Sequence, residues 1–255
     1  MTKLTEDSRY TACGVPVKVK ILPYGTRWNK DCCGFRKGDL YKADRKLSNG
    51  TGRACGITVH NTDDSADAET YVRATFNQNM KTSRVHFYVD DKEAWQNLEL
   101  DEVGWHAGTG DRGRGNDDTV AVEIIMGGRD AQKDAKSEEN GARLVAYLLH
   151  RLDLPADAVV THKHWSGKNC PAYILPHWEA FLARVKEAYE SMKNEQTTVA
   201  SGVDAYAAPA VEKAVGSGLL RGDGTGDLRL REPLLRQDAL VLLDRLGLLP
   251  DAPQK

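Results

Sequence analysis

Apolar and polar residues alternate, or apolar residues run together, in several short stretches of this chain, as they do in β-strands with one or two buried faces. Glycine, proline or small polar residues bound most of these stretches. The predicted strands are 15–22, 55–62, 84–91, 94–100, 119–125 and 158–161. The remainder of residues 1–50 shows no pattern that assigns it, and 104–118 has the composition of a glycine-rich loop.

Apolar residues at helical spacing predict helices between the strands. One amphipathic helix is predicted over 66–81. Ser137 is a candidate N-cap for a second helix, whose apolar face ends at Leu152. Pro176 opens a third helix, whose apolar stripe reaches Met192. Strands that alternate with helices predict an α/β domain in which helices flank a mixed central β-sheet.

The composition changes after Lys193. Residues 194–205 are small and polar, which is typical of a linker. Beyond them, residues 206–249 hold two short helical patterns around a glycine-rich turn, and a module of about 45 residues is marginal as an independent fold. We therefore expect a larger α/β domain at 1–193, a linker at 194–205 and a small helical module at 206–255.

Composition and charge limit the partners and the cellular compartment that we expect for the chain. The chain has 255 residues, 40% of them apolar and 28% charged, with a formal net charge of −2. This charge does not favour nucleic acid or an anionic membrane as a partner. No apolar run approaches the roughly 18 residues of a membrane span, and the N-terminus lacks a signal peptide, so we expect synthesis in the cytosol. In a reducing compartment no disulfides are expected among the five cysteines, which are Cys13, Cys32, Cys33, Cys55 and Cys170.

The segment 159–175 concentrates metal-capable and charged side chains, namely His162, His164, Lys168 and Cys170. Three neighbours in one loop rarely complete a zinc site, so a ligand from a second segment is needed. His60, at the end of a predicted strand, is the candidate. A single histidine here would more commonly be structural or solvated, but the combination predicts zinc.

Glu123 lies inside the otherwise apolar strand 119–125 and shares a face with Ala121 and Ile125. An unpaired buried carboxylate is costly, so it must find a cation or stay protonated with a raised pKa. Either state suits a general acid–base beside a metal. A structural ion pair with an arginine or lysine is the alternative.

Five motifs together resemble the zinc-dependent N-acetylmuramoyl-L-alanine amidases of the phage-lysozyme and peptidoglycan-recognition type. They are VHNT (59–62), VHFYVDD (85–91), GWHAG (104–108), NDDTVAVEI (116–124) and THKHWSGKNCP (161–171). They follow one another in the family's order, and the resemblance covers roughly residues 50–190. It implies the family's α/β fold and its activity.

The resemblance also implies a role for each site residue. His60, His162 and Cys170 match the zinc ligands, and His164 falls outside that register. Glu123 matches the catalytic carboxylate, and Lys168 matches the lysine that stabilises the oxyanion. The implied substrate-binding residues are Trp105, His106, Asn61 and Thr62, whereas His86 matches a histidine that is more often structural.

The implied reaction is hydrolysis of the amide between N-acetylmuramic acid and L-alanine in bacterial peptidoglycan, with one zinc per chain and Glu123 as general acid–base. One alternative is a non-catalytic zinc-containing peptidoglycan-binding protein, against which the complete ligand set argues. The other is a zinc-stabilised structural module closed by His164, which leaves Glu123 and Lys168 without a role.

Residues 210–249 resemble one S-layer-homology repeat, a cell-wall-anchoring unit in which Arg236 and Asp238 would contact the wall. The match departs at Leu235, where the family usually has threonine, and this puts the polymer specificity in doubt. A calcium loop at DGTGD is a rival with an incomplete ligand pattern. An amidase with such a tail resembles a phage endolysin, held in the host cytoplasm until lysis. The expected partners are peptidoglycan and a secondary wall polymer, with self-association as a second way for the module to bury its core.

Overall fold

A computed structural model describes residues 3–27, 36–38, 45–77, 83–110, 112–200, 207–217 and 243. The chain divides into two compact units, Met1–Asn194 and Glu195–Lys255, and each is described by itself. Of the residues singled out above, Cys32, Cys33, Arg236 and Asp238 lie outside the described residues.

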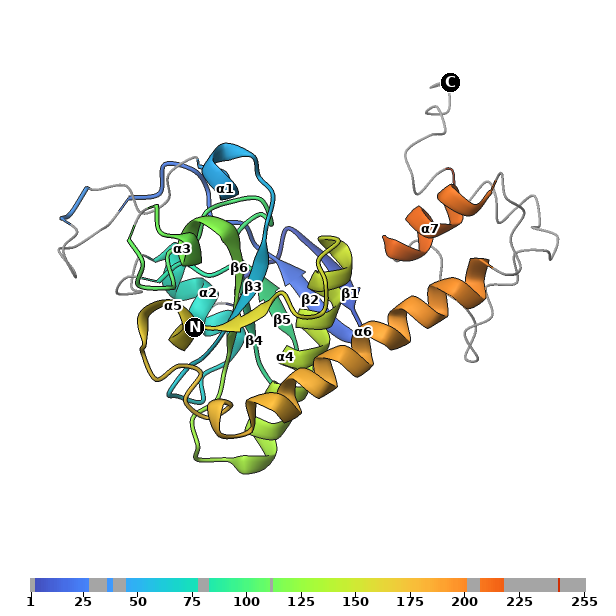
Figure 1. Ribbon diagram of the computed structural model, residues 1–255. Coiled ribbons are helices and arrows are strands. Elements are labelled where there is room, and N and C mark those ends of the chain that lie inside the picture. Colours follow the sequence, from blue (N-terminus) through green and yellow to red (C-terminus); the bar gives the residue numbers. More distant parts are fainter. Residues whose placement is uncertain are drawn as a thin grey trace, which may run out of the picture. The chain divides into compact units, whose positions relative to one another are not determined.

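The first unit is built on one mixed seven-stranded sheet with the order β1-β2-β5-β4-β6-β3-β7 (Figure 1). Its strands are β1 Ser8–Ala12, β2 Val15–Val19, β3 Gly56–Asn61, β4 Phe87–Val89, β5 Ala94–Gln96, β6 Thr119–Ile124 and β7 Val159–Thr161. The pairs β1–β2 and β4–β5 are antiparallel, and the other neighbours are parallel. The predicted mixed sheet is confirmed, with shorter strands at 84–91 and 94–100 than expected.

The register of the central strands places polar residues in one row across the sheet. His60 of β3 pairs with Glu123 of β6, and Glu123 pairs on its other side with Tyr88 of β4. Because side chains alternate along each strand, these residues share one face. Their neighbours Val59 and Val122 point to the opposite face and join the main core.

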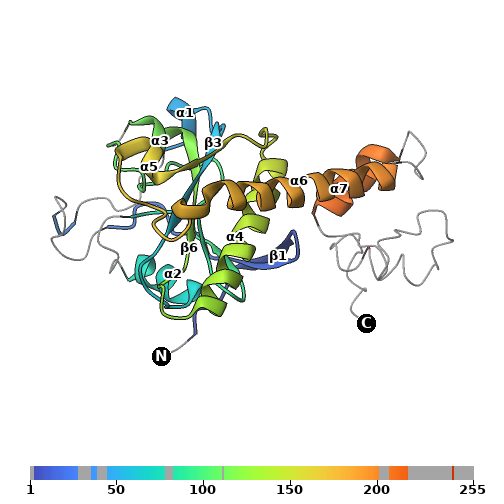
Figure 2. The same cartoon turned by 60° about the horizontal axis from the view of Figure 1, so that its bottom comes forward.

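Helices cover both faces of the sheet (Figure 2). Helix α4 (Ala131–Arg151) and the first part of α6 (Trp178–Ala200) pack on the face of Val59 and Val122. Helix α2 (Ala68–Phe76) packs on the other face, where Ala68 and Val72 contact the cluster around Tyr88. The polar row therefore lies on the α2 face, and α2, which contacts β4 and β5, covers its Tyr88 end.

The remaining helical elements of the first unit are short. They are α1 Leu47–Gly50, α3 Arg114–Asp118, α5 His162–Ser166 and the 3-10 turn η1 Leu175–His177. Helix α3 lies in the stretch predicted as a glycine-rich loop. At Gly115, a Cβ atom would lie 2.4 Å from Ala107 Cβ and 2.9 Å from the Trp165 ring. Glycine is therefore what lets α3 approach both the 105–110 loop and α5.

Two helix boundaries differ from the sequence prediction. Helix α4 begins earlier than expected, because the carboxylate of Asp130 accepts hydrogen bonds from the backbone of Gln132 and Lys133. Ser137 is thus not an N-cap but a buried residue inside the helix. Helix α6 continues to Ala200, so residues 194–200 of the expected linker are helical; neither glycine nor proline interrupts the stretch.

The second unit contributes helix α7, Ala208–Gly216, which matches the first helical pattern predicted for the module. Most of 218–255 lies outside the described residues. Within the described part of both units, no helix has the length and apolar character needed to span a membrane.

Candidate metal centre and active site

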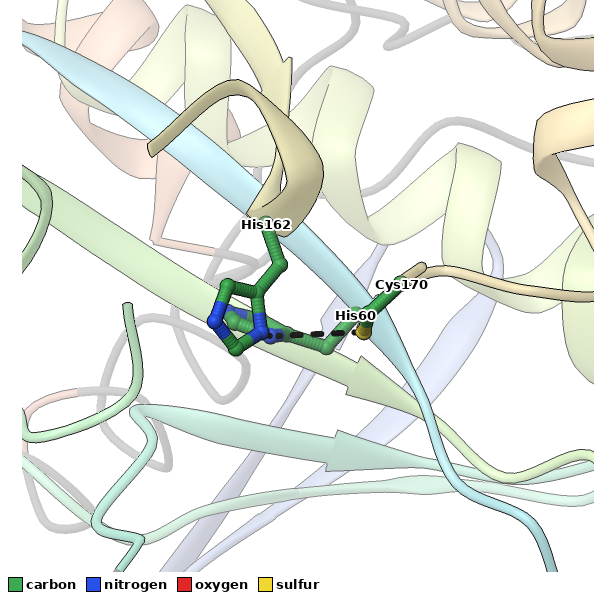
Figure 3. A group of neighbouring side chains, drawn as sticks. All are labelled: His60, His162 and Cys170. Atoms are coloured by element: carbon green, nitrogen blue, oxygen red, sulfur yellow. Dashed lines mark hydrogen bonds between the residues drawn. The ribbon is translucent and has the colours of Figure 1, made fainter. Parts of the chain in front are cut away.

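Three side chains from separate elements converge at the end of β3 (Figure 3). His60 comes from β3, His162 is the first residue of α5, and Cys170 lies in the loop that follows. His60 Nδ1 lies 3.1 Å from His162 Nδ1 and 3.8 Å from Cys170 Sγ. All three potential ligand atoms lie within 4.8 Å of one another.

The local fold explains why these residues meet. Strand β7 pairs in parallel with β3, so that Thr161 is opposite Val59 and the next residue, His162, arrives beside His60. Thr161 then caps α5 by accepting a hydrogen bond from the backbone of His164 at 3.1 Å. The backbone N–H of Lys163 donates to the carbonyl of Cys170 at 2.9 Å, which closes the loop back onto the site.

The donor set fits a zinc ion. Two imidazole nitrogens and one thiolate are ligands that zinc prefers. Burial lowers the pKa of His60 well below its usual range, and burial with the nearby charge of Lys168 lowers the pKa of His162 to about 4. Both rings are therefore neutral at neutral pH. Burial, followed by the charge of Glu123, raises the pKa of Cys170 to about 11, so a bound cation is needed to hold it as thiolate.

Glu123 is suited to exchange protons beside this centre. Burial raises its pKa to about 7, Lys168 acts in the opposite direction, and Asp64 adds to the rise. A carboxyl that titrates near neutral pH can both accept and donate a proton under physiological conditions. Its place beside His60 on the neighbouring strand follows directly from the register of β3 and β6.

Lys168 and His164 occupy the exposed side of the site. Lys168 is exposed, and its charge influences His60, His162 and Glu123. His164 is also exposed; its ring lies edge-on to Trp165, with 4.6 Å between the ring centroids. It does not belong to the group of three ligands, in agreement with the predicted register.

The residues expected to contact substrate have other partners in the structure. Thr62 is buried, and its hydroxyl bonds the backbone of Met126. Asn61 accepts a hydrogen bond from the backbone of Tyr173 at 3.1 Å. Both residues therefore support the loops around the site, and the substrate contact expected of them stays a prediction. Trp105 is partly exposed and pairs through its backbone with Arg84.

His106 and His86 both lie below the surface. His106 is buried behind His60, and its Nδ1 lies 3.1 Å from His60 Nε2. The substrate contact expected of His106 stays a prediction. His86 is structural, since its Nδ1 accepts from the backbone of Ala121 at 3.0 Å and its Nε2 donates to the carbonyl of Glu102 at 2.8 Å.

Asn116 is a site residue that sequence reasoning missed. Its Oδ1 accepts hydrogen bonds from the backbone N–H groups of His106 at 2.7 Å and Ala107 at 2.8 Å. The available signal was an asparagine placed ahead of an apolar strand, inside a motif already noted. Nothing in that pattern indicates which loop the amide holds.

Known proteins match the segment that carries this site. A family model described as N-acetylmuramoyl-L-alanine amidase matches residues 51–173. The chain is 43% identical over 129 residues to the N-acetylmuramoyl-L-alanine amidase CwlH of Bacillus subtilis, a match that covers 49% of this chain and 50% of CwlH. The chain thus spans about half the length of the curated relatives it matches.

Solved structures match over a longer stretch. The catalytic domain of XlyA, an amidase of Bacillus subtilis, superposes with a TM-score of 0.55 at 32% identity, covering 67% of this chain and 99% of that domain. A mutant endolysin from Bacillus subtilis superposes with a TM-score of 0.52 at 35% identity, with coverage of 67% and 99%. Because nearly the whole of each solved domain is matched and the metal centre lies inside the match, this chain belongs to the N-acetylmuramoyl-L-alanine amidase family.

Proposed function

We propose that this protein hydrolyses the amide bond between N-acetylmuramic acid and L-alanine in bacterial peptidoglycan, with one zinc ion per chain. The observation that carries the proposal is the His60, His162 and Cys170 donor set beside Glu123, a carboxyl whose pKa is raised to about 7. The family supports the choice of substrate.

Zinc bound by the three ligands would supply Lewis acidity, which activates water near neutral pH and polarises an amide carbonyl. The residues of the chain supply the proton transfers and the charge stabilisation. Glu123 would take a proton from the attacking water and return it to the leaving amine of L-alanine. Lys168, exposed beside the centre, would stabilise the negative charge that develops on the carbonyl oxygen.

An endolysin-like role is part of this proposal. The similarity to a solved endolysin supports it. The protein would remain in the host cytoplasm until lysis and then act on the wall. The second unit would attach it to a secondary wall polymer, with Arg236 and Asp238 as the proposed contacts.

Mass spectrometry of digested peptidoglycan tests the reaction. New free amino groups on L-alanine are expected, whereas new reducing sugar ends would indicate a glycosidase. Cys170→Ser should lose most of the zinc and the lysis. Glu123→Gln should keep its zinc and lose about 10²–10⁴ in rate. Binding to walls without any product would instead indicate a peptidoglycan-binding protein that is not an enzyme.

A further inference from the structure

The loop 105–110 lies behind both histidine ligands. On one side, His106 Nδ1 lies 3.1 Å from His60 Nε2, and the two rings meet edge to face with centroids 5.1 Å apart. On the other side, the backbone of Ala107 lies close enough to the His162 ring to influence its pKa. A Cβ atom on Gly108 would lie 3.7 Å from His162 Nε2. The two Nδ1 atoms face each other, so His60 Nε2 faces His106 in this loop, and the same loop passes beside the His162 ring.

We propose that His106 is a positioning residue for the metal centre: it accepts a hydrogen bond from His60 Nε2 and so leaves His60 Nδ1 with the lone pair that binds the metal. Its value for catalysis rests on the proposed function, but the inference itself concerns metal binding. Ligand histidines commonly donate to a carboxylate or a carbonyl. An imidazole acceptor orients the ring without adding negative charge, and the metal keeps more of its Lewis acidity.

The direction of this hydrogen bond follows from the surroundings. If His106 donated, His60 would carry its own proton on Nδ1, which faces His162 Nδ1 at 3.1 Å, and could not bind a metal there. His106 Nε2 is buried and makes no hydrogen bond of ordinary geometry with the described residues. Because His60 Nε2 must donate if its Nδ1 is to bind a metal, the one proton of the neutral His106 ring lies on its own Nε2. His106 Nδ1 is then the acceptor.

A single buried amide sets the loop in place. Asn116 Oδ1 accepts from the backbone of His106 and Ala107, and Asn116 Nδ2 donates to the carbonyl of Gly110 at 2.9 Å. The side chain is only 1% exposed, so water does not compete for these bonds. Asn116 therefore fixes the loop that carries His106 beside His60.

Zinc affinity of the full chain, measured by competition with a chromophoric chelator, tests the role of His106. His106→Leu keeps similar bulk but removes the acceptor, and should weaken zinc binding by about 10- to 100-fold. His106→Asn offers an amide oxygen close to the position of Nδ1 and should recover most of the affinity. His164→Ala, at an exposed histidine beside the site, is the matched control with unchanged affinity. Thermal unfolding without metal shows whether each variant is folded.

NMR of the ring nitrogens in the metal-free wild-type protein needs no substitution. His60 and His106 should each carry their proton on Nε2. A proton on His60 Nδ1 overturns the proposal, and so does a folded His106→Leu that binds zinc as tightly as the wild type. An equal loss of zinc affinity in His106→Asn and His106→Leu overturns the proposal too, because altered packing would then explain both variants. Neither measurement uses peptidoglycan, so a failure of the proposed function would leave these results intact.

Discussion

Burial of Glu123, the proposed general acid–base, lowers the stability of the folded protein. Its pKa rises from 4.5 to about 7 in the folded protein, so the folded state holds this proton more tightly than the unfolded chain does. Below about pH 4.5 the carboxyl is protonated in both states and costs nothing. As the pH rises toward about 7, stability is lost progressively, and above that value the loss is constant. The raised pKa of Glu123 thus destabilises the metal-free fold at neutral pH.

We expect Glu123→Gln to raise the free energy of unfolding of the metal-free protein by about 2 kcal/mol near pH 8 and by almost nothing near pH 4. This gain in the free energy of unfolding is smaller than the full pKa shift would give, because Glu123 keeps some contact with solvent. Urea unfolding of both proteins at the two pH values measures it. A difference that does not vary with pH would show that the wild-type carboxyl is not held at a raised pKa.

Zinc binding should release a single proton. The pKa of His162 is lowered to about 4 and that of His60 also falls, so neither ring has a proton to lose at neutral pH. The pKa of Cys170 is raised to about 11, so the thiol must lose its proton. The logarithm of the affinity should therefore rise by about one per pH unit between about pH 5 and 8. Calorimetry of the Glu123→Gln variant, which has no carboxyl proton to lose, in buffers of different ionisation enthalpy counts the protons, and a count of two or three would contradict the low pKa values of the histidines.

The metal ligands could be predicted from the sequence, but the residues that support them could not. His60 ends an apolar strand, and His162 and Cys170 frame a loop with a recognisable spacing. The position of His106 behind His60 could not be predicted, because nothing in the letters WHAG separates an exposed ring from one buried behind a ligand. That distinction depends on how closely α3 and the 105–110 loop approach β3, which is a property of the packing.

At the scale of elements, strands of regular pattern were predicted better than short helices. Strands β3 and β6 follow their apolar runs closely. Strand β1 was missed because its residues are mostly exposed and its partner follows a tight turn, where Cys13 and Gly14 both have positive φ. Helix α3 was missed because glycine lowers helix propensity, although here it permits close packing.

Gly115 is the residue on which this close packing depends. We expect Gly115→Ala to destabilise the protein by about 1–3 kcal/mol, since its Cβ would lie 2.4 Å from Ala107 Cβ and one neighbour must move. Displacement of Ala107 should also weaken zinc binding. Gly216→Ala in α7, a helical glycine with open space around it, is the control and should be neutral or slightly stabilising. Thermal unfolding and zinc competition measure both effects; equal behaviour of the two variants would argue against a tight contact at α3.

At the scale of the whole molecule, the sheet extends beyond the segment that matches the family. The family match begins at residue 51, whereas β1 and β2 come from residues 8–19 and add to β5 at the edge of the sheet. On the other side of the match, α6 runs to Ala200 and carries Phe181 and Val185 into the main core. The first unit is therefore larger than the family segment, and a shortened protein should keep both additions.

We expect a chain that ends at Ala200 to fold, to bind about one zinc ion and to cleave soluble muropeptides as fast as the full chain, because every proposed ligand precedes it. On intact walls the shortened chain should be slower, since a second attachment raises the local enzyme concentration near the substrate.

Lysis of whole cells and turnover of soluble muropeptides are compared for both chains, with light scattering to detect self-association of the second unit. A chain that ends at Lys193 serves as a control that cuts α6 itself. Equal lysis by the full chain and the chain ending at Ala200 would exclude a targeting role for the second unit. If the chain ending at Ala200 failed to fold, the first unit would depend on the second.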